Sequence, residues 1–235
     1  MKILQRFNIL QKKRNEMALN RKIQPQGEEI GTIDIIQAKK SVLDNGIPYY
    51  SIDCGNNEVV KLDFIFPAGL WYQKKPFVAS TTSMMLQEGT SKKSSVEIAE
   101  ILDYYGAYLH LNVERDFAFV SLFSLNKYLD KTLDLVEDIL FNPVFPEKEL
   151  STYIMKKKQI LAVEFEKVKV LARKKFDNVL FGHNHPYGQQ SEIADFDNIK
   201  QTDIVNFFKQ NYYLGKCRII ASGKLDRRLQ TNLNK

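Results

Sequence analysis

The sequence predicts an α+β fold in which helices cover a mostly antiparallel sheet. Segments with strand and helix patterns come in blocks rather than in strict alternation, which is typical of this class. The clearest strand, 59–66, carries apolar side chains at every second position, whereas the stretch 147–181 carries them every three or four residues. With 235 residues, 44% of them hydrophobic, the chain has enough apolar material for a large core.

The N-terminal part of the chain predicts a polar arm followed by three strands. Residues 1–30 are mostly polar and include Gln24-Pro25-Gln26-Gly27, which favours an extended arm, and we assign 31–235 to one domain. The expected strands are 31–37, 47–52 and 59–66. Asn45-Gly46 predicts a turn between the first two strands because both residues tolerate a positive φ. Asn56-Asn57 predicts a hairpin turn between the second and the third.

After the first three strands, the sequence predicts two helices, then two strands, then further helices and a last strand. The expected helices are 75–87, 96–105, 128–140 and 201–208, and the expected strands are 107–113, 117–123 and 217–222. Gly89 ends the first of these helices, and Ser94 or Ser95 caps the second, with Glu97 in its first turn. Glu114-Arg115-Asp116 predicts the turn that lets two of the strands pair.

The longest helix is expected at 147–181, with Pro146 just before it, where a missing N–H leaves no helical hydrogen bond unmade. Its apolar residues at helical spacing are Leu161, Phe165, Val168, Ala172, Phe176 and Val179. Its other face is rich in lysine, at Lys156, Lys157, Lys158, Lys167, Lys169, Lys174 and Lys175. Glu164, Glu166 and Asp177 are interspersed, so a solvated helix face is favoured over a basic groove.

The most specific motif is the segment 79–90, which reads ASTTSMMLQEGT. It resembles the metal-binding helix of the pitrilysin/insulinase (mitochondrial-processing-peptidase-like) zinc peptidases, written A-H-x-x-E-H-M-L-x-x-G-T. The positions that match in register are Ala79, Met85, Leu86, Gly89 and Thr90. In that family the two histidines bind zinc and the glutamate is the general base. The corresponding residues here are Ser80, Ser83 and Met84, and two hydroxyls and a thioether do not replace imidazole ligands.

Other landmarks of this family follow in the family's order. They are Leu43-Asp44-Asn45-Gly46-Ile47, Gly106, Asn142-Pro143-Val144-Phe145 with Glu149-Leu150, and His185-Pro186-Tyr187-Gly188. The resemblance implies a processing-peptidase-like domain. Subunits of the family usually carry two such domains in tandem, so we expect this chain to be the first domain, with the second absent.

The remaining candidate ligands predict no metal site and no cofactor. The family's third zinc ligand is a glutamate on the long helix, for which the candidates are Glu164 and Glu166; a solvated carboxylate is the favoured interpretation of either. His110, His183 and His185 are each interpreted as core or surface histidines. No glycine-rich phosphate loop and no nucleophile elbow occur. At the degenerate motif we expect Met84 to pack inward while Ser80 and Ser83 line a small pocket.

The charge and the cysteine content limit which classes of partner and which cellular compartment we expect. The net charge is +6, but the lysines are scattered among acidic residues, so nucleic acid is not expected as a partner. Cys54 and Cys217 indicate no disulfide framework; they pair only if their strands are neighbours, and two reduced, buried thiols are favoured. No apolar run suits a signal peptide or a membrane span. The cytoplasm is the default compartment, and the periplasm is the alternative if the N-terminus is incomplete.

The resemblance also indicates what the chain can do without zinc. The family's active domain binds its peptide as an added strand along a sheet edge, and 107–113 matches that strand by position. Main-chain pairing needs no particular side chain, so peptide binding survives the loss of the metal. The candidate peptide-binding residues are His110, Leu111 and Asn112.

The leading hypothesis is a catalytically inactive subunit that pairs with an active zinc peptidase of the family to enclose or bind peptides. The alternative is a stand-alone scaffold or binding module without a peptidase partner. An enzyme with a new active site has the least support, because no other group of residues converges on a chemistry.

Overall fold

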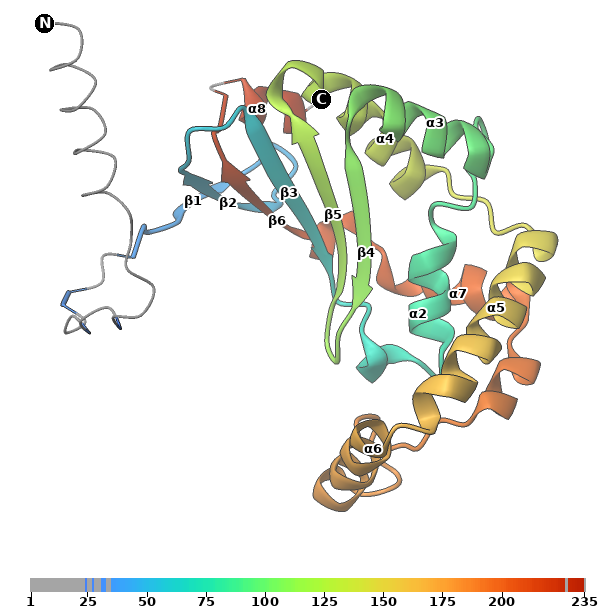
Figure 1. Ribbon diagram of the computed structural model, residues 1–235. Coiled ribbons are helices and arrows are strands. Elements are labelled where there is room, and N and C mark those ends of the chain that lie inside the picture. Colours follow the sequence, from blue (N-terminus) through green and yellow to red (C-terminus); the bar gives the residue numbers. More distant parts are fainter. Residues whose placement is uncertain (1–23, 25–26, 28–30, 33–34, 227, 235) are drawn as a thin grey trace, which may run out of the picture. The chain divides into compact units, whose positions relative to one another are not determined.

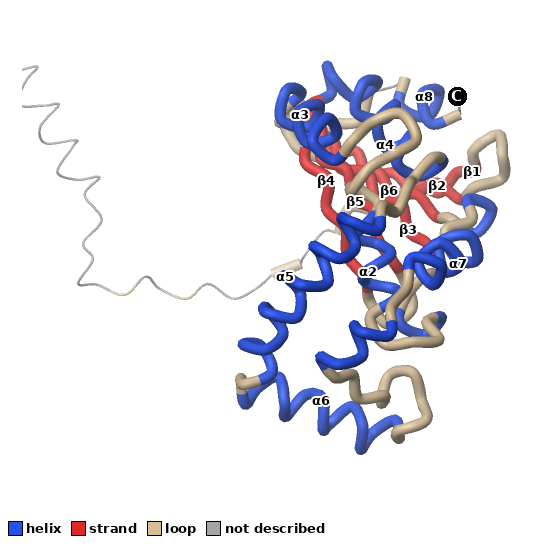
Figure 2. The backbone as a smooth tube through the Cα atoms, turned by 90° about the vertical axis from the view of Figure 1, so that its right-hand side faces the viewer, coloured by secondary structure: helices blue, strands red, loops and turns tan. Residues whose placement is uncertain are grey.

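A computed structural model describes residues 24, 27, 31–32, 35–226 and 228–234. Residues Gln37–Lys235 form one compact unit, in which a six-stranded sheet carries its helices mainly on one side (Figures 1 and 2). The strand order is β1-β2-β6-β3-β5-β4, and every pair is antiparallel except β2 with β6. The predicted α+β class, with a mostly antiparallel sheet, is confirmed.

The elements have the following bounds. The strands are β1 Lys39–Val42, β2 Pro48–Asp53, β3 Val59–Phe66, β4 Tyr108–Val113, β5 Ala118–Leu125 and β6 Arg218–Gly223. The helices are α2 Val78–Met85, α3 Ser95–Tyr105, α4 Leu129–Phe141, α5 Glu147–Phe165, α6 Val168–Phe181, α7 Gln201–Asn211 and α8 Leu229–Leu233. Short 3-10 turns are η1 Leu70–Tyr72, η2 Asn126–Tyr128, η3 Ile193–Asn198 and η4 Leu214–Lys216.

Local sequence signals place several elements correctly. In β3 the alternate residues Val60, Leu62 and Phe66 are buried on the helix-covered face, as the period-two pattern predicts. Helix α3 begins with a capping box, in which the Ser94 hydroxyl accepts from the Glu97 N–H and the Glu97 carboxylate accepts from the Ser94 N–H. Gly106 ends that helix in the left-handed region at φ +60°.

Two predictions about the first strands are wrong. The first strand is β1, Lys39–Val42, and not 31–37, of which residues 33–34 lie outside the described part. The turn 43–47, which contains Asn45-Gly46, sets its position, because the residues on either side of this turn, Val42 and Pro48, pair with each other. The expected hairpin at Asn56-Asn57 does not form, because β6 lies between β2 and β3 and pairs with both. A strand this distant in sequence leaves no trace in a local turn signal.

Both cysteines are free thiols, but only Cys217 is buried, whereas Cys54 is half-buried, contrary to the expectation that both are buried. Because β2 and β6 are parallel, with Tyr49 opposite Ile219 and Asp53 opposite Gly223, Cys54 and Cys217 lie near opposite ends of this pair. At about 3.3 Å per residue the two are about 20 Å apart along the strands, far beyond the reach of a disulfide.

The predicted single helix 147–181 is two helices. Lys167 between them is extended, at φ −73° and ψ 122°, although no proline or glycine marks the break. Helix α6 has no buried residue, and its Val168, Phe176 and Val179 are 80%, 60% and 86% exposed. The apolar pattern therefore faces outward here instead of packing on the core.

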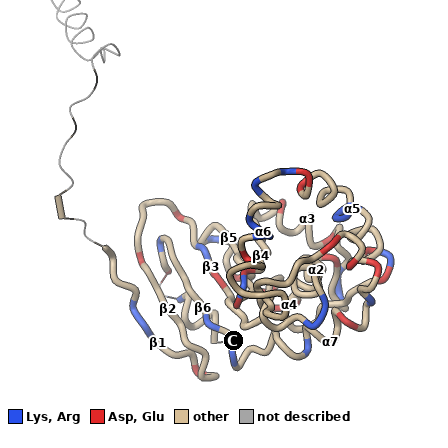
Figure 3. The backbone as a smooth tube through the Cα atoms, turned by 90° about the horizontal axis from the view of Figure 1, so that it is seen from below, with Lys and Arg blue, Asp and Glu red and all other residues tan. Residues whose placement is uncertain are grey.

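Several lysines on the lysine-rich face of these helices have polar partners. Lys158 forms an ion pair with Asp197, and the Lys174 ammonium donates to the Ser191 carbonyl at 2.6 Å. Basic and acidic positions are interspersed over the helices (Figure 3), which agrees with a solvated face rather than a basic groove. No helix in the described ranges combines the length and the apolar character needed to cross a bilayer.

Candidate functional site

Helix α2 carries the degenerate motif, and it lies against both β4 and α7 (Figure 2). It begins after Phe77, whose φ of +66° is unusual for a residue with a side chain. The Phe77 ring stacks on Phe196 at 4.2 Å between centroids, and its carbonyl accepts from the Thr81 N–H at 2.9 Å and the Ser80 hydroxyl at 3.1 Å. These contacts hold the strained residue that sets the start of the helix.

The three positions of the missing metal chemistry differ in their surroundings. Ser80 and Met84, one turn apart, lie on the same side of α2 and are half-buried, with Met84 packed against the core as expected. Ser83 is 1% exposed and faces the Tyr212 hydroxyl. Ser80 donates to the Phe77 carbonyl, whereas Ser83 is enclosed by the core, and the small pocket expected between them stays a prediction.

Two pairs of facing hydroxyls surround α2, and nothing in the sequence indicates them. Thr81 faces Tyr153 of α5, and Ser83 faces Tyr212 just after α7, yet none of these hydroxyls has a partner at normal hydrogen-bond geometry. Burial raises the pKa of Tyr153 to about 12 and also raises the pKa of Tyr212, against the opposing effect of the facing hydroxyls. Both phenols therefore stay protonated at neutral pH and cannot replace the general base.

The loop after α2 is fastened to α4 by the buried carboxylate of Asp138. Its Oδ2 accepts from the Thr90 hydroxyl at 2.8 Å and from the Lys93 ammonium at 2.9 Å, and its Oδ1 accepts from the Asn142 amide at 3.1 Å. Burial raises the pKa of the Asp138 carboxyl, but these three donors outweigh it and the net pKa is below the usual range. Two of the matched landmark residues, Thr90 and Asn142, thus meet at one network.

The candidate third ligands are not gathered into a metal site. Glu164 pairs with Lys167 at the break between α5 and α6, and Glu166 is exposed. His110 and His183 are also exposed. Within the described ranges, no group of three or more His, Cys, Asp or Glu side chains is placed to hold a metal ion.

His185 has a packing role in the loop after α6. Its ring contacts those of Trp71, Phe181 and Tyr187 at centroid distances of 5.4, 5.3 and 4.9 Å, and its Nδ1 accepts from the Tyr187 N–H. Arg115, in the β4–β5 turn, lies over the Phe181 ring and forms a 2.8 Å ion pair with Asp177 of α6. The cluster therefore anchors α6 to the β4–β5 turn at the end of the sheet.

Strand β4 is the outer strand of the sheet and pairs with β5 along one side (Figure 1). Leu109 and Leu111 are buried, whereas His110 and Asn112 are exposed, as the alternation predicts. In an antiparallel edge strand, alternate residues point their N–H and C=O groups away from the partner strand. The candidates His110, Leu111 and Asn112 are thus adjacent on an edge that offers main-chain hydrogen bonds.

Comparison with known sequences matches the central part of the chain. The family model described as insulinase (peptidase family M16) matches residues 78–184, from α2 to the loop after α6. The beta subunit of the mitochondrial processing peptidase of Neurospora crassa is 23% identical over 145 residues, which cover 58% of this chain and 29% of that protein.

Comparison with solved structures extends the similarity to most of the fold. A peptidase M16 inactive domain from Pseudomonas fluorescens superposes with a TM-score of 0.77 at 23% identity, covering 84% of this chain and 49% of that one. A protease from Helicobacter pylori superposes with a TM-score of 0.67 at 18% identity, covering 86% and 50%. The chain spans about half the length of these solved chains and less than a third of the processing-peptidase subunit.

Proposed function

Since the chain contains a domain of the peptidase M16 (insulinase) family, we propose that it is a non-catalytic subunit that pairs with an active zinc peptidase of the same family. The observation that carries the proposal is the set of residues on α2 at the family's metal-binding positions. Ser80 and Met84 occupy the positions of the two zinc ligands, and Ser83 occupies that of the base. The helix lies against β4 and α7 in a fold that superposes on a peptidase M16 domain, which supports a retained fold without the metal ligands. The structural relative described as an inactive domain supports the same conclusion.

The first prediction of this proposal concerns zinc. The full chain, equilibrated with zinc sulfate and desalted, should retain well below one zinc per chain, because a catalytic zinc site needs three protein ligands. It should also hydrolyse no unstructured peptide alone. Near-stoichiometric zinc, removed by a chelator together with peptide hydrolysis, would contradict the proposal, and a Glu164→Gln variant would then test whether that residue is a ligand.

The pairing surface that we propose is the outward apolar face of α5 and α6. Its most exposed members are Met155, Ile160, Val163, Val168, Phe176, Val179 and Leu180. Large apolar side chains that are exposed in such number on two consecutive helices are typical of a protein interface. The edge of β4 that pairs with no strand of the described residues would face the enclosed space, where it adds a peptide strand at His110, Leu111 and Asn112.

The pairing prediction is tested by co-expression with an intact H-x-x-E-H member from the same source. The two chains should co-elute, and peptide hydrolysis should exceed that of the partner alone. Val179→Asp, at an 86% exposed position, should abolish co-elution without unfolding the chain. The matched control is Tyr104→Asp on α3, which is 80% exposed and outside the proposed surface.

The results of the co-expression experiment distinguish pairing with a peptidase from the scaffold alternative. If the partner is equally active with and without this chain, and the chains do not co-elute, pairing with a peptidase is excluded. Recovery of the full chain in a complex that contains no peptidase would then support the scaffold alternative. Equal loss of co-elution in the Val179 and Tyr104 variants would move the interface away from α6.

A further inference from the structure

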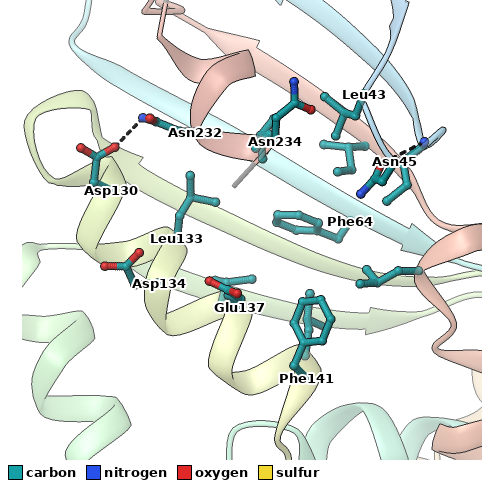
Figure 4. Close-up of a pocket in the computed structure, with 16 residues that line it drawn as sticks. Leu43, Asn45, Phe64, Asp130, Leu133, Asp134, Glu137, Phe141, Asn232 and Asn234 are labelled. Atoms are coloured by element: carbon teal, nitrogen blue, oxygen red, sulfur yellow. Dashed lines mark hydrogen bonds between the residues drawn. The ribbon is translucent and has the colours of Figure 1, made fainter.

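A cavity of about 330 Å³ lies between the sheet and α4, closed at one end by α8 and by the turn before β2 (Figure 4). Its floor is apolar, with Phe64 and Ile219 from the sheet and Leu133 and Phe141 from α4. This volume falls within the lower range of small-molecule sites, about 300–1,000 Å³. None of its lining residues belongs to α2 or β4, so the cavity is separate from the site described above.

One side of the cavity is a row of carboxylates. Asp130, Asp134 and Glu137 follow each other at helical spacing along α4, spread over about 10 Å of helix. All three are exposed at the mouth, and the Asp130 carboxylate accepts from the Asn232 amide (Figure 4). Of the lysines and arginines that the structure describes, none forms an ion pair with Asp134 or Glu137.

We propose that this cavity binds a small organic cation with an apolar body, such as an aliphatic or aromatic ammonium. The apolar floor removes the body from water, which supplies most of the affinity. The carboxylates at the mouth attract the ammonium and repel an anion of the same shape, which supplies the specificity. This inference is independent of the pairing with a peptidase, because it uses another set of residues.

The test compares three probes that share a phenylalkyl body. Titration of the full chain with 4-phenylbutylammonium should give saturable one-to-one binding by calorimetry and by NMR shifts at the cavity residues. The isosteric anion 5-phenylpentanoate should bind at least about tenfold more weakly, and 4-phenylbutanol should fall between the two. Raising the salt from about 50 to about 500 mM should weaken only the binding of the ammonium, because the carboxylates are exposed and screened.

Two kinds of variant separate charge from shape. The double variant Asp134→Asn/Glu137→Gln should weaken ammonium binding by about tenfold and leave the alcohol unchanged, since each exposed charge pair contributes modestly. Glu100→Gln, an exposed carboxylate on α3, is the control and should change neither. Leu133→Phe, which fills part of the cavity, should weaken all three probes. Equal affinity for the cation and the anion, insensitivity of the ammonium to the double variant, or no saturable binding below about 10 mM would each overturn the proposal.

Discussion

Replacing Ser83 by glutamate should destabilise the domain by about 3–5 kcal/mol rather than restore a catalytic base. Ser83 is 1% exposed and faces Tyr212. A carboxylate in this place loses its hydration and gains the Tyr212 phenol as a donor. The restored motif residue is therefore incompatible with the packing that surrounds it.

The loss of stability caused by Ser83→Glu should depend on pH. Burial favours the neutral acid, so the folded-state pKa of the introduced glutamate lies above its unfolded value of about 4.3. Relative to the parent chain, the variant should lose least stability below that value and progressively more as the pH rises towards the folded-state pKa.

The measurement is urea unfolding of the parent and the variant at pH 5 and at pH 8. Ser83→Ala is the control, and it should remain within about 1 kcal/mol of the parent because it removes a hydroxyl that has no hydrogen bond of normal geometry. If Ser83→Glu is as stable as Ser83→Ala at pH 8, the Ser83 site is more open to water than its burial indicates.

Replacing Asp138 by alanine is expected to cost about 3–5 kcal/mol, because it breaks a buried ion pair and leaves three donors without their acceptor. Those donors are Thr90, Lys93 and Asn142, which join the loop after α2 to α4. Asp138→Asn keeps the shape but loses the charge, so it should cost less than alanine. Asp134→Asn, exposed on the same helix, should change stability by less than about 0.5 kcal/mol.

Asp138 should also contribute to acid unfolding, with a sign opposite to that of the introduced glutamate. Its pKa is lowered in the folded state, so its stabilisation is present above the unfolded value of about 3.9 and is lost as the pH falls through the folded-state pKa. The stability difference between the parent and Asp138→Asn should therefore shrink on acidification. A difference that stays constant between pH 7 and pH 3 would show that the carboxylate is not held ionised by this network.

Local sequence patterns predict a structural feature correctly where the interactions that form this feature are themselves local. The alternation in β3, the capping box at Ser94 and the turn at Asn45-Gly46 each act within a few residues, and each appears in the structure where the sequence predicts it. The degenerate motif on α2 was also recognisable, because its register with the family pattern depends only on residue order. The sequence alone thus determined the fold class, the loss of the metal-ligand residues and the edge position of β4.

Only the tertiary structure decided how distant segments meet. The pairing of β6 between β2 and β3, the break at Lys167 and the facing of Ser83 and Tyr212 each join parts of the chain that carry no shared local signal. The cavity beside α4 is a similar case, because its apolar floor joins residues of the sheet to residues of α4, which also supplies the acidic mouth. Secondary structure follows from short-range backbone and side-chain preferences, whereas burial and hydrogen-bond partners depend on which surfaces the whole chain brings together.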